Sequence, residues 1–216
     1  MFARMNPTTT RSAASRIYLL AAHPHWRDSR VNRRLFQAAQ QVAGVDANDL
    51  YASYPDYDVD VEAEQQRLLR AELLVLVHPI QWYSMPPLQK LWFDEVLAWG
   101  WAYGAGGAAL HGKDCWLVAT TGGPETSYHP KSYNRYFFDA FLPPYEQTAA
   151  LCGMRFLPPL LFHGARSAST AELDAHVELF ADRLARYPDW PEIEHLPACE
   201  MEVVPSTDRP EEEEQG

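Results

Sequence analysis

The feature of this sequence that most constrains its fold is a regular alternation of apolar runs with helical segments. The run LLVLVHP (73–79) is continuously apolar, as expected for a strand buried on both faces of a sheet. Further strands are predicted at 17–22, near 49–51, at 115–123 and at 154–164. Because helices separate these runs, we expect an α/β fold with a parallel sheet covered on both faces. The doubly wound strand order 2-1-3-4-5 is one common solution, and it places a ligand crevice at the carboxyl ends of strands 1 and 3.

The helical segments are indicated by apolar residues that recur every three to four positions. The first spans 29–44, with Ser29 predicted as its N-cap and Gly44 as its C-cap. The others are predicted at 59–72, 86–100, 132–153 (with a Pro-Pro break) and 170–187.

The chain is long enough for one domain with a full core, and neither a repeat nor a linker divides it. We predict a domain at 16–190, a disordered extension at 1–15 and an acidic, flexible tail at 191–216. The beginning of the chain lacks the apolar segment of a secretory signal; an early start codon and an arginine-rich transit peptide are the alternatives to a disordered extension. No apolar run approaches the ~18 residues of a membrane span.

Charge and cysteine content narrow the partners and the compartment. A net charge of −11 makes nucleic acid a poor partner. Residues 23–34 nevertheless carry four arginines and two histidines against one aspartate, which indicates an anionic ligand; a helix with a basic outer face is the competing explanation. Cys115, Cys152 and Cys199 are odd in number and widely spaced, which favours reduced thiols in a cytoplasm over a disulfide frame or a zinc site.

Three loops of different character follow strands 1, 3 and 4 and are expected to meet at one edge of the sheet. HPHWRDSRVN (23–32) is basic and opens a helix, which suits a phosphate. HPIQWYSMPP (78–87) is aromatic, and TTGGPETSYHP (120–130) offers glycines with free backbone N–H groups. FMN, with a phosphate, a planar ring and polar ring edges, matches all three better than NAD or ATP, whose glycine-rich motifs are absent.

Each loop also has an explanation without a ligand. Trp82 and Tyr83 would cap the core, the Gly-Gly pair would be an ordinary turn, and His23 and His78 would satisfy neighbouring backbone groups. Agreement of the three loops at one edge of the predicted sheet favours a binding site.

The strings AAHPHWRDSRVN, HPIQWYSMPPLQKLWFDEVLAWGWAYGAGGAALHGK and VATTGGP resemble the flavodoxin-like NAD(P)H quinone oxidoreductase family. Within it they are most similar to bacterial ancillary proteins of the glutathione-regulated potassium-efflux transporters. The resemblance covers about residues 16–188, and W-Y-S-x-P-P-L and T-T-G-G are its specific parts. It implies a flavodoxin-like fold, FMN as cofactor, NADH or NADPH as donor, quinones as acceptors, a homodimer, and a cytoplasmic location, peripheral to the inner membrane where a transporter partner is present.

The resemblance also implies which residues form the site. Tyr128 follows Gly123 by five residues, as in mammalian-type quinone reductases, where a tyrosine at this spacing hydrogen-bonds the flavin. The histidine that follows it there corresponds to Asn134, and His129 is the candidate substitute. The implied FMN-binding residues are His23, Ser29, Val31 and Asn32 for the phosphate and ribityl chain, Ile80, Gln81, Trp82 and Tyr83 around the ring, and Thr120, Thr121, Gly122 and Gly123 for N–H groups beside it.

The implied reaction is ping-pong: a nicotinamide reduces the flavin and leaves, and a quinone takes its place. The alternative is a regulatory subunit of a potassium–proton antiporter that keeps flavin for structure or sensing. A flavodoxin-type electron carrier is disfavoured because its T-x-T-G-x-T loop is missing after the first strand.

Two segments after strand 3 suggest further features. The helix at 86–98 and the loop after it carry Leu88, Leu91, Trp92 and Trp99, which is more apolar surface than one sheet face needs. We predict that a homodimer buries part of it; a monomer core is the alternative.

The glycine-rich segment 99–112 contains Trp101 and Tyr103. We predict that it is a flap over the flavin edge that excludes water when it closes. The alternative is a surface connection whose aromatic residues fill a gap in the core.

Overall fold

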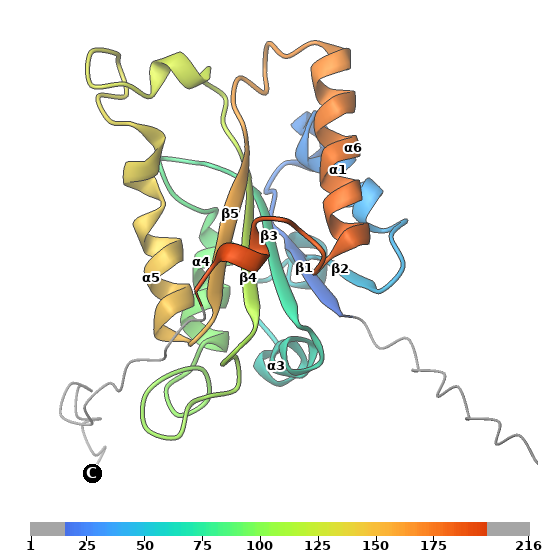
Figure 1. Cartoon of the computed structure of the whole chain (residues 1–216), viewed down its shortest axis with the longest axis vertical. Helices are drawn as coiled ribbons and strands as arrows, with labels where there is room; N and C mark the ends of the chain where they lie inside the picture. Colours follow the sequence, from blue (N-terminus) through green and yellow to red (C-terminus); the bar gives the residue numbers. More distant parts are fainter. Residues whose placement is uncertain (1–15, 198–216) are drawn as a thin grey trace, which may run out of the picture.

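The computed structural model describes residues 16–197 and contains the predicted parallel sheet. Every neighbouring pair of strands is parallel, and the predicted order 2-1-3-4-5 is confirmed. All carboxyl ends therefore lie at one edge of the sheet (Figure 1). The predicted extension at 1–15 and residues 198–216 of the tail predicted at 191–216 lie outside the described residues. The strands are β1 (Ile17–Ala21), β2 (Val45–Asp49), β3 (Leu73–Pro79), β4 (Asp114–Thr120) and β5 (Arg155–Phe162).

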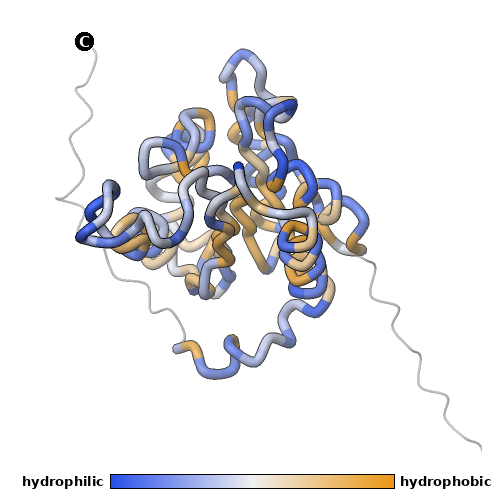
Figure 2. The backbone as a smooth tube through the Cα atoms, turned by 90° about the horizontal axis from the view of Figure 1, so that it is seen from above, coloured by the Kyte–Doolittle hydropathy of each residue, from blue (hydrophilic) through white to orange (hydrophobic). Residues whose placement is uncertain are grey.

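Helices cover both faces of this sheet. One face packs against α1 and α6, and the other packs against the remaining helices. In Figure 2 the apolar segments gather in the interior, between the helices and the sheet. The helices are α1 (Asn32–Ala39), α2 (Leu50–Ser53), α3 (Val61–Arg70), α4 (Pro87–Val96), α5 (Pro143–Leu151) and α6 (Thr170–Arg186), with short 3-10 helices at Trp26–Asp28 (η1), Glu125–Ser127 (η2), Phe138–Phe141 (η3) and Ile193–His195 (η4).

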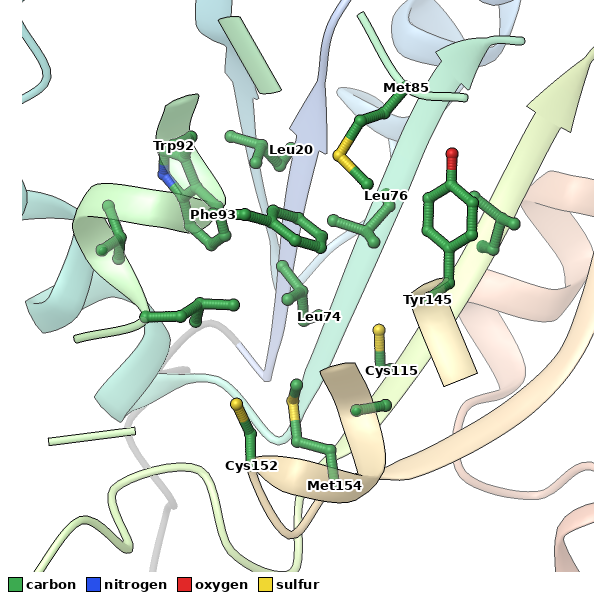
Figure 3. Close-up of a cluster of buried hydrophobic side chains, with 14 of the residues drawn as sticks. Leu20, Leu74, Leu76, Met85, Trp92, Phe93, Cys115, Tyr145, Cys152 and Met154 are labelled. Carbon is green, nitrogen blue, oxygen red and sulfur yellow. The ribbon is translucent and has the colours of Figure 1, made fainter. Parts of the chain in front are cut away.

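Alternation along β3 divides the core in two. Leu74 and Leu76 face α4, where they meet Phe93 (Figure 3), while Val75 and Val77 belong to the cluster against α1 and α6. A strand buried on both faces has no polar side to alternate with, which explains the continuous apolar run.

The second strand and the first helix differ from their predicted positions. The strand ends at Asp49, because the Asp49 carboxylate accepts hydrogen bonds from the backbone N–H groups of Tyr51 (3.1 Å) and Ala52 (3.3 Å) and so caps α2. The prediction near 49–51 was therefore wrong by several residues. The first helix is shorter than 29–44: Val31 occupies its N-cap position instead of Ser29, and the helix ends well before Gly44.

The predicted helix at 132–153 was also wrong in its first half. Residues 128–137 form an irregular loop at the carboxyl edge of the sheet, followed by η3. The Pro-Pro pair does not break a helix but starts α5 at Pro143, where a missing N–H has no cost.

A buried polar network holds α3 and α4 to the sheet. Glu64 is fully buried, and its carboxylate accepts hydrogen bonds from Trp92 Nε1 (2.8 Å), the Tyr54 hydroxyl (2.8 Å) and Asn48 Nδ2 (3.2 Å), as well as from the Tyr18 hydroxyl. Burial of a carboxylate is tolerated only with such pairing.

The segment after α6 returns to the core. Trp190 is buried and its ring meets Trp116 at a centroid distance of 4.7 Å, and Arg183 pairs with Glu192 at 2.5 Å. Between residues 16 and 197, no helix combines the length and the apolar character that crossing a membrane requires.

The flap prediction is wrong for a topological reason. Because α4 runs back from the carboxyl edge, residues 99–112 lie at the amino-terminal edge, directly before β4 and away from the crevice (Figure 1). Gly112 donates its backbone N–H to the Gly153 carbonyl (2.9 Å), and Trp101 and Tyr103 pack against the core.

The helix α4 exposes less apolar surface than its sequence suggests. Leu88 and Trp92 are fully buried within the monomer, and Figure 3 shows Trp92 and Phe93 inside the core. The part of the dimer argument that rested on these two side chains is therefore wrong.

Candidate functional site

A cavity of about 360 Å³ opens at the carboxyl edge of the sheet, where the loops after β1, β3, β4 and β5 meet. All the predicted FMN-binding residues line it except Trp82, Tyr83 and Gly123. The residues that line it are His23, His25, Asp28, Ser29, Arg30, Val31, Asn32, Pro79, Ile80, Gln81, Thr120, Thr121, Gly122, Ala165 and Arg166.

The N-terminus of α1 forms one wall of the cavity. Ser29 Oγ accepts a hydrogen bond from the Arg33 backbone N–H (3.1 Å), and Asn32 Nδ2 donates to Thr120 Oγ1 (2.8 Å). Asn32 Oδ1 is buried without a partner in residues 16–197. The first N–H groups of a helix have no acceptor in the helix, and its dipole favours an anion there. This wall therefore suits a phosphate with neighbouring hydroxyl groups.

Histidine and arginine side chains extend this wall. His23 Nδ1 accepts a hydrogen bond from the His25 backbone N–H (3.1 Å), and burial, followed by the charge of His25, lowers the His23 pKa. Arg30 donates to the carbonyl oxygens of Arg166 (2.9 Å) and Ala168 (3.0 Å), so it ties the loop before α1 to the loop after β5.

The aromatic loop after β3 is a tight two-residue turn. Gln81 and Ser84 exchange both backbone hydrogen bonds, at 2.9 and 3.1 Å, and Trp82 and Tyr83 between them have φ angles of 48° and 67°. These are the angles of a type I′ turn, which normally takes Asn-Gly, so two aromatic residues strain it. The Trp82 side chain is 94% exposed and the Tyr83 ring stacks on Phe141 at 5.1 Å.

The segment from Thr120 to Gly122 forms a second wall, which meets α1 where Asn32 bonds Thr120, and Gly123 follows it outside the lining. Within the described chain, the backbone N–H groups of Gly122 and Gly123 donate no hydrogen bond. A Cβ atom at Gly123 would lie 2.8 Å from the Tyr133 hydroxyl and 2.9 Å from Ser127 Oγ, so a larger residue there would have to displace these side chains. This turn therefore offers N–H donors to the polar edge of a flat ligand.

Tyr128 and His129, the predicted catalytic pair, lie outside the cavity lining. Tyr128 is half-buried against Phe138 and His163, and burial raises its pKa, while a hydrogen bond with the Thr121 side chain acts in the opposite direction. His129 is exposed and accepts a hydrogen bond from the Lys131 backbone N–H (3.2 Å). The structure does not bring the His129 ring against Tyr128.

Sequence reasoning missed the fourth loop, 163–169, which follows β5. It contributes Ala165 and Arg166 to the cavity, and a Cβ atom on Gly122 would lie 3.4 Å from Arg166 Nε. The available signal was the predicted strand order, which places β5 beside β4 and its loop beside TTGG.

Comparison with known proteins agrees with this architecture. A family model described as the flavodoxin-like fold matches residues 15–184. The chain belongs to this family. Over 179 residues the flavodoxin-like chain is 42% identical to the glutathione-regulated potassium-efflux system ancillary protein KefF of Citrobacter koseri, which covers 83% of this chain and 99% of that protein.

Solved structures with the same fold carry different names. A protein named as a thermophilic tryptophan halogenase from Streptomycin violaceusniger is 37% identical, with a TM-score of 0.74 over 76% of this chain and 96% of that one. General stress protein 14 of Treponema denticola, in complex with FMN, is 34% identical, with a TM-score of 0.74 over 78% and 97%. An NADPH-quinone reductase from P. pentosaceus is 25% identical, with a TM-score of 0.71 over 78% and 97%. The flavodoxin-like fold alone therefore does not decide the reaction.

Proposed function

We propose that the crevice binds FMN and that the protein reduces quinones with NADH or NADPH. The observation that carries the proposal is the cavity itself, which joins an anion-binding helix N-terminus to Gly122, whose N–H group donates no hydrogen bond within residues 16–197. The FMN complex of the Treponema denticola protein and the name of the P. pentosaceus reductase support it.

The residues that line the cavity fit the parts of FMN. Ser29, Asn32 and the N-terminus of α1 would hold the phosphate and the ribityl hydroxyl groups, while Ile80 and Gln81 would line the ring. Bound FMN supplies two-electron transfer between a nicotinamide and a quinone. Gly122 lines the cavity, and the N–H groups of the 122–123 turn would donate to the polar edge of the ring, where such donors stabilise the negative charge of a reduced flavin.

Outside the cavity, the aromatic residues supply a surface for flat substrates. The rigid turn at Trp82 and Tyr83 borders the crevice with little freedom to lose on binding. Tyr128 is held beside Thr121 and is our candidate for a proton-bearing group; His129, which is exposed, is the weaker candidate.

Steady-state kinetics test this proposal. We expect a ping-pong pattern, with parallel double-reciprocal lines when NADPH and a benzoquinone are varied together. FMN-loaded protein that oxidises NADPH without reducing any quinone would refute the quinone reductase activity.

The similarity to KefF, which extends over 99% of that protein, favours a second function. In it the chain is an ancillary subunit of a potassium-efflux transporter at the cytoplasmic face of the inner membrane. The test is co-purification with the transporter from the same cell. Turnover without any stable transporter complex would reject this alternative.

We also propose a homodimer. A groove of about 310 Å³ lies between α4 and α5, lined by Met85, Phe93 and Leu151 among others, and a second copy would cover it. Sedimentation showing a stable monomer near the chain mass of 24.6 kDa at micromolar concentration would remove the proposal.

A further inference from the structure

The loop after β5 is bonded to the turn that we assign to the flavin ring. Gly164 donates its backbone N–H to the Gly123 carbonyl (2.8 Å), and Ala165 donates to the Thr121 carbonyl (2.9 Å). Thr121 in turn donates its backbone N–H to the Phe162 carbonyl (2.9 Å). The two loops therefore form one unit.

The Thr121 hydroxyl lies at the centre of this unit. It is 2.8 Å from the Gly123 carbonyl and 3.0 Å from His163 Nδ1. A hydroxyl has one proton to donate and accepts two hydrogen bonds. Because a carbonyl cannot donate, the Thr121 proton goes to Gly123, and His163 donates its Nδ1–H to Thr121 Oγ1.

The surroundings of His163 hold its ring in this orientation. The ring is half-buried and lies 5.4 Å from the Tyr128 ring and 5.1 Å from the Phe138 ring, measured between centroids. Burial lowers its pKa, while Glu125 acts in the opposite direction. A neutral ring with its proton on Nδ1 satisfies the geometry.

We propose that His163 is a positioning residue, which through Thr121 fixes the Gly122–Gly123 turn and thereby tunes the redox potential of the flavin. This inference rests on the proposed function, because it assigns the turn to the ring. Loss of the Nδ1–H donor leaves the Thr121 hydroxyl held only by its bond to the Gly123 carbonyl and so loosens the turn. N–H groups that are no longer aligned stabilise the reduced, negatively charged flavin less than before.

The first test needs no flavin. Nitrogen-15 NMR of FMN-free protein reports which ring nitrogen carries the proton, and we expect Nδ1–H for His163. A proton on Nε2 alone would overturn the proposal, whether or not the protein binds FMN, so this result is separable from failure of the proposed function.

The second test measures the flavin potential. His163→Leu is expected to lower the ratio of affinities for reduced over oxidised FMN about tenfold, which is about 30 mV in a two-electron potential. His163→Asn, whose Nδ2–H replaces the Nδ1–H donor, is expected to restore it. The control His111→Leu, at the opposite edge of the sheet, should not shift the potential.

If His163→Leu and the wild-type protein both bind FMN and have the same redox potential, the proposal is overturned. The quinone reductase assignment stays intact in that case. If His163→Leu does not fold, Thr121→Val removes the same hydroxyl link and is expected to give the same shift, with Thr121→Ser as its matched control. An unchanged potential in Thr121→Val would likewise overturn it.

Discussion

Two sets of buried polar groups lie on the same sheet and differ in how completely they are paired. The Glu64 carboxylate accepts hydrogen bonds from four side chains. In contrast, the unpaired buried polar atoms found between residues 16 and 197 lie in the part of the molecule that borders the carboxyl edge. They belong to Trp26, Asn32, His78, Gln89, Tyr145 and His176.

The positions of these unpaired groups follow from the fold. They occupy the ends of strands, the first turns of helices that start at the carboxyl edge, or, for His176, a site against Phe162 at the end of β5. Polar groups that are paired within the chain stabilise it, whereas groups left unpaired near a cavity mark where a ligand or water is expected. The comparison predicts that substitutions in the first set affect mainly stability, and that substitution of Asn32, the member of the second set that lines the cavity, affects mainly binding.

The largest expected effect is on the paired set. Glu64→Ala removes the acceptor that four side-chain donors share and should lower the free energy of unfolding by about 3–5 kcal/mol, measured by urea denaturation of FMN-free protein. Glu62→Ala on the exposed face of α3 is the matched control and should change it by less than about 0.5 kcal/mol. Equal effects of the two substitutions would contradict the structural role of the network.

The next largest effect is on the way in which the free energy of unfolding depends on pH. Burial lowers the pKa of His78 to about 4 from an ordinary value of 6.5. Between these values the unfolded histidine binds a proton and the folded one does not, so the free energy of unfolding should fall as the pH drops from 6.5 to 4.

The expected slope is about 1.4 kcal/mol per pH unit for such a histidine. His78→Phe keeps a ring against Tyr145 and should flatten the denaturation profile in this window, whereas the exposed His111→Phe should not. A profile that is unchanged in His78→Phe would show that His78 is not held neutral.

A smaller effect is expected at the cavity wall. Asn32→Leu removes the side chain that lines the proposed phosphate and ribityl region and should weaken FMN binding by about 1–3 kcal/mol, measured by flavin fluorescence. Unfolding of the FMN-free variant controls for loss of the Thr120 hydrogen bond. Unchanged FMN affinity would mean that the phosphate lies elsewhere.

The smallest effect is at the strained turn. Trp82→Asn relieves a positive φ angle without losing buried contacts and should raise the free energy of unfolding by about 1 kcal/mol, with raised Michaelis constants and unchanged FMN content. Tyr133→Asn, an exposed aromatic residue without a positive φ angle, is the control and should not stabilise the protein. Destabilisation by Trp82→Asn would show that the turn carries no strain.

The sequence pattern predicted the strands and their alternation with helices, because these depend on residues that lie close together in the chain. The continuous run at 73–79 and the alternation of strands with helices lead to the observed sheet order, and the three loops then converge as expected. The burial of Glu64 could not be predicted, because a glutamate in a polar helix is normally exposed, and its partners come from β1, β2, the end of α2 and α4.

The flap prediction and the missed loop after β5 both depended on how segments far apart in the chain are arranged. Residues 99–112 look mobile by composition, but their place is set by the direction of α4, which takes them to the opposite edge. Arg166 lines the crevice, and His163 contacts Thr121, only because β5 pairs with β4, a contact that the local sequence around 163–169 does not show.

The absorbance spectrum of the purified protein tests the central claim most directly. After gel filtration with added FMN, we expect flavin bands to remain with the chain, to bleach on addition of NADPH without oxygen, and to return on addition of a benzoquinone. Protein that leaves the column without flavin bands, or bands that NADPH does not bleach, would contradict the assignment of the crevice.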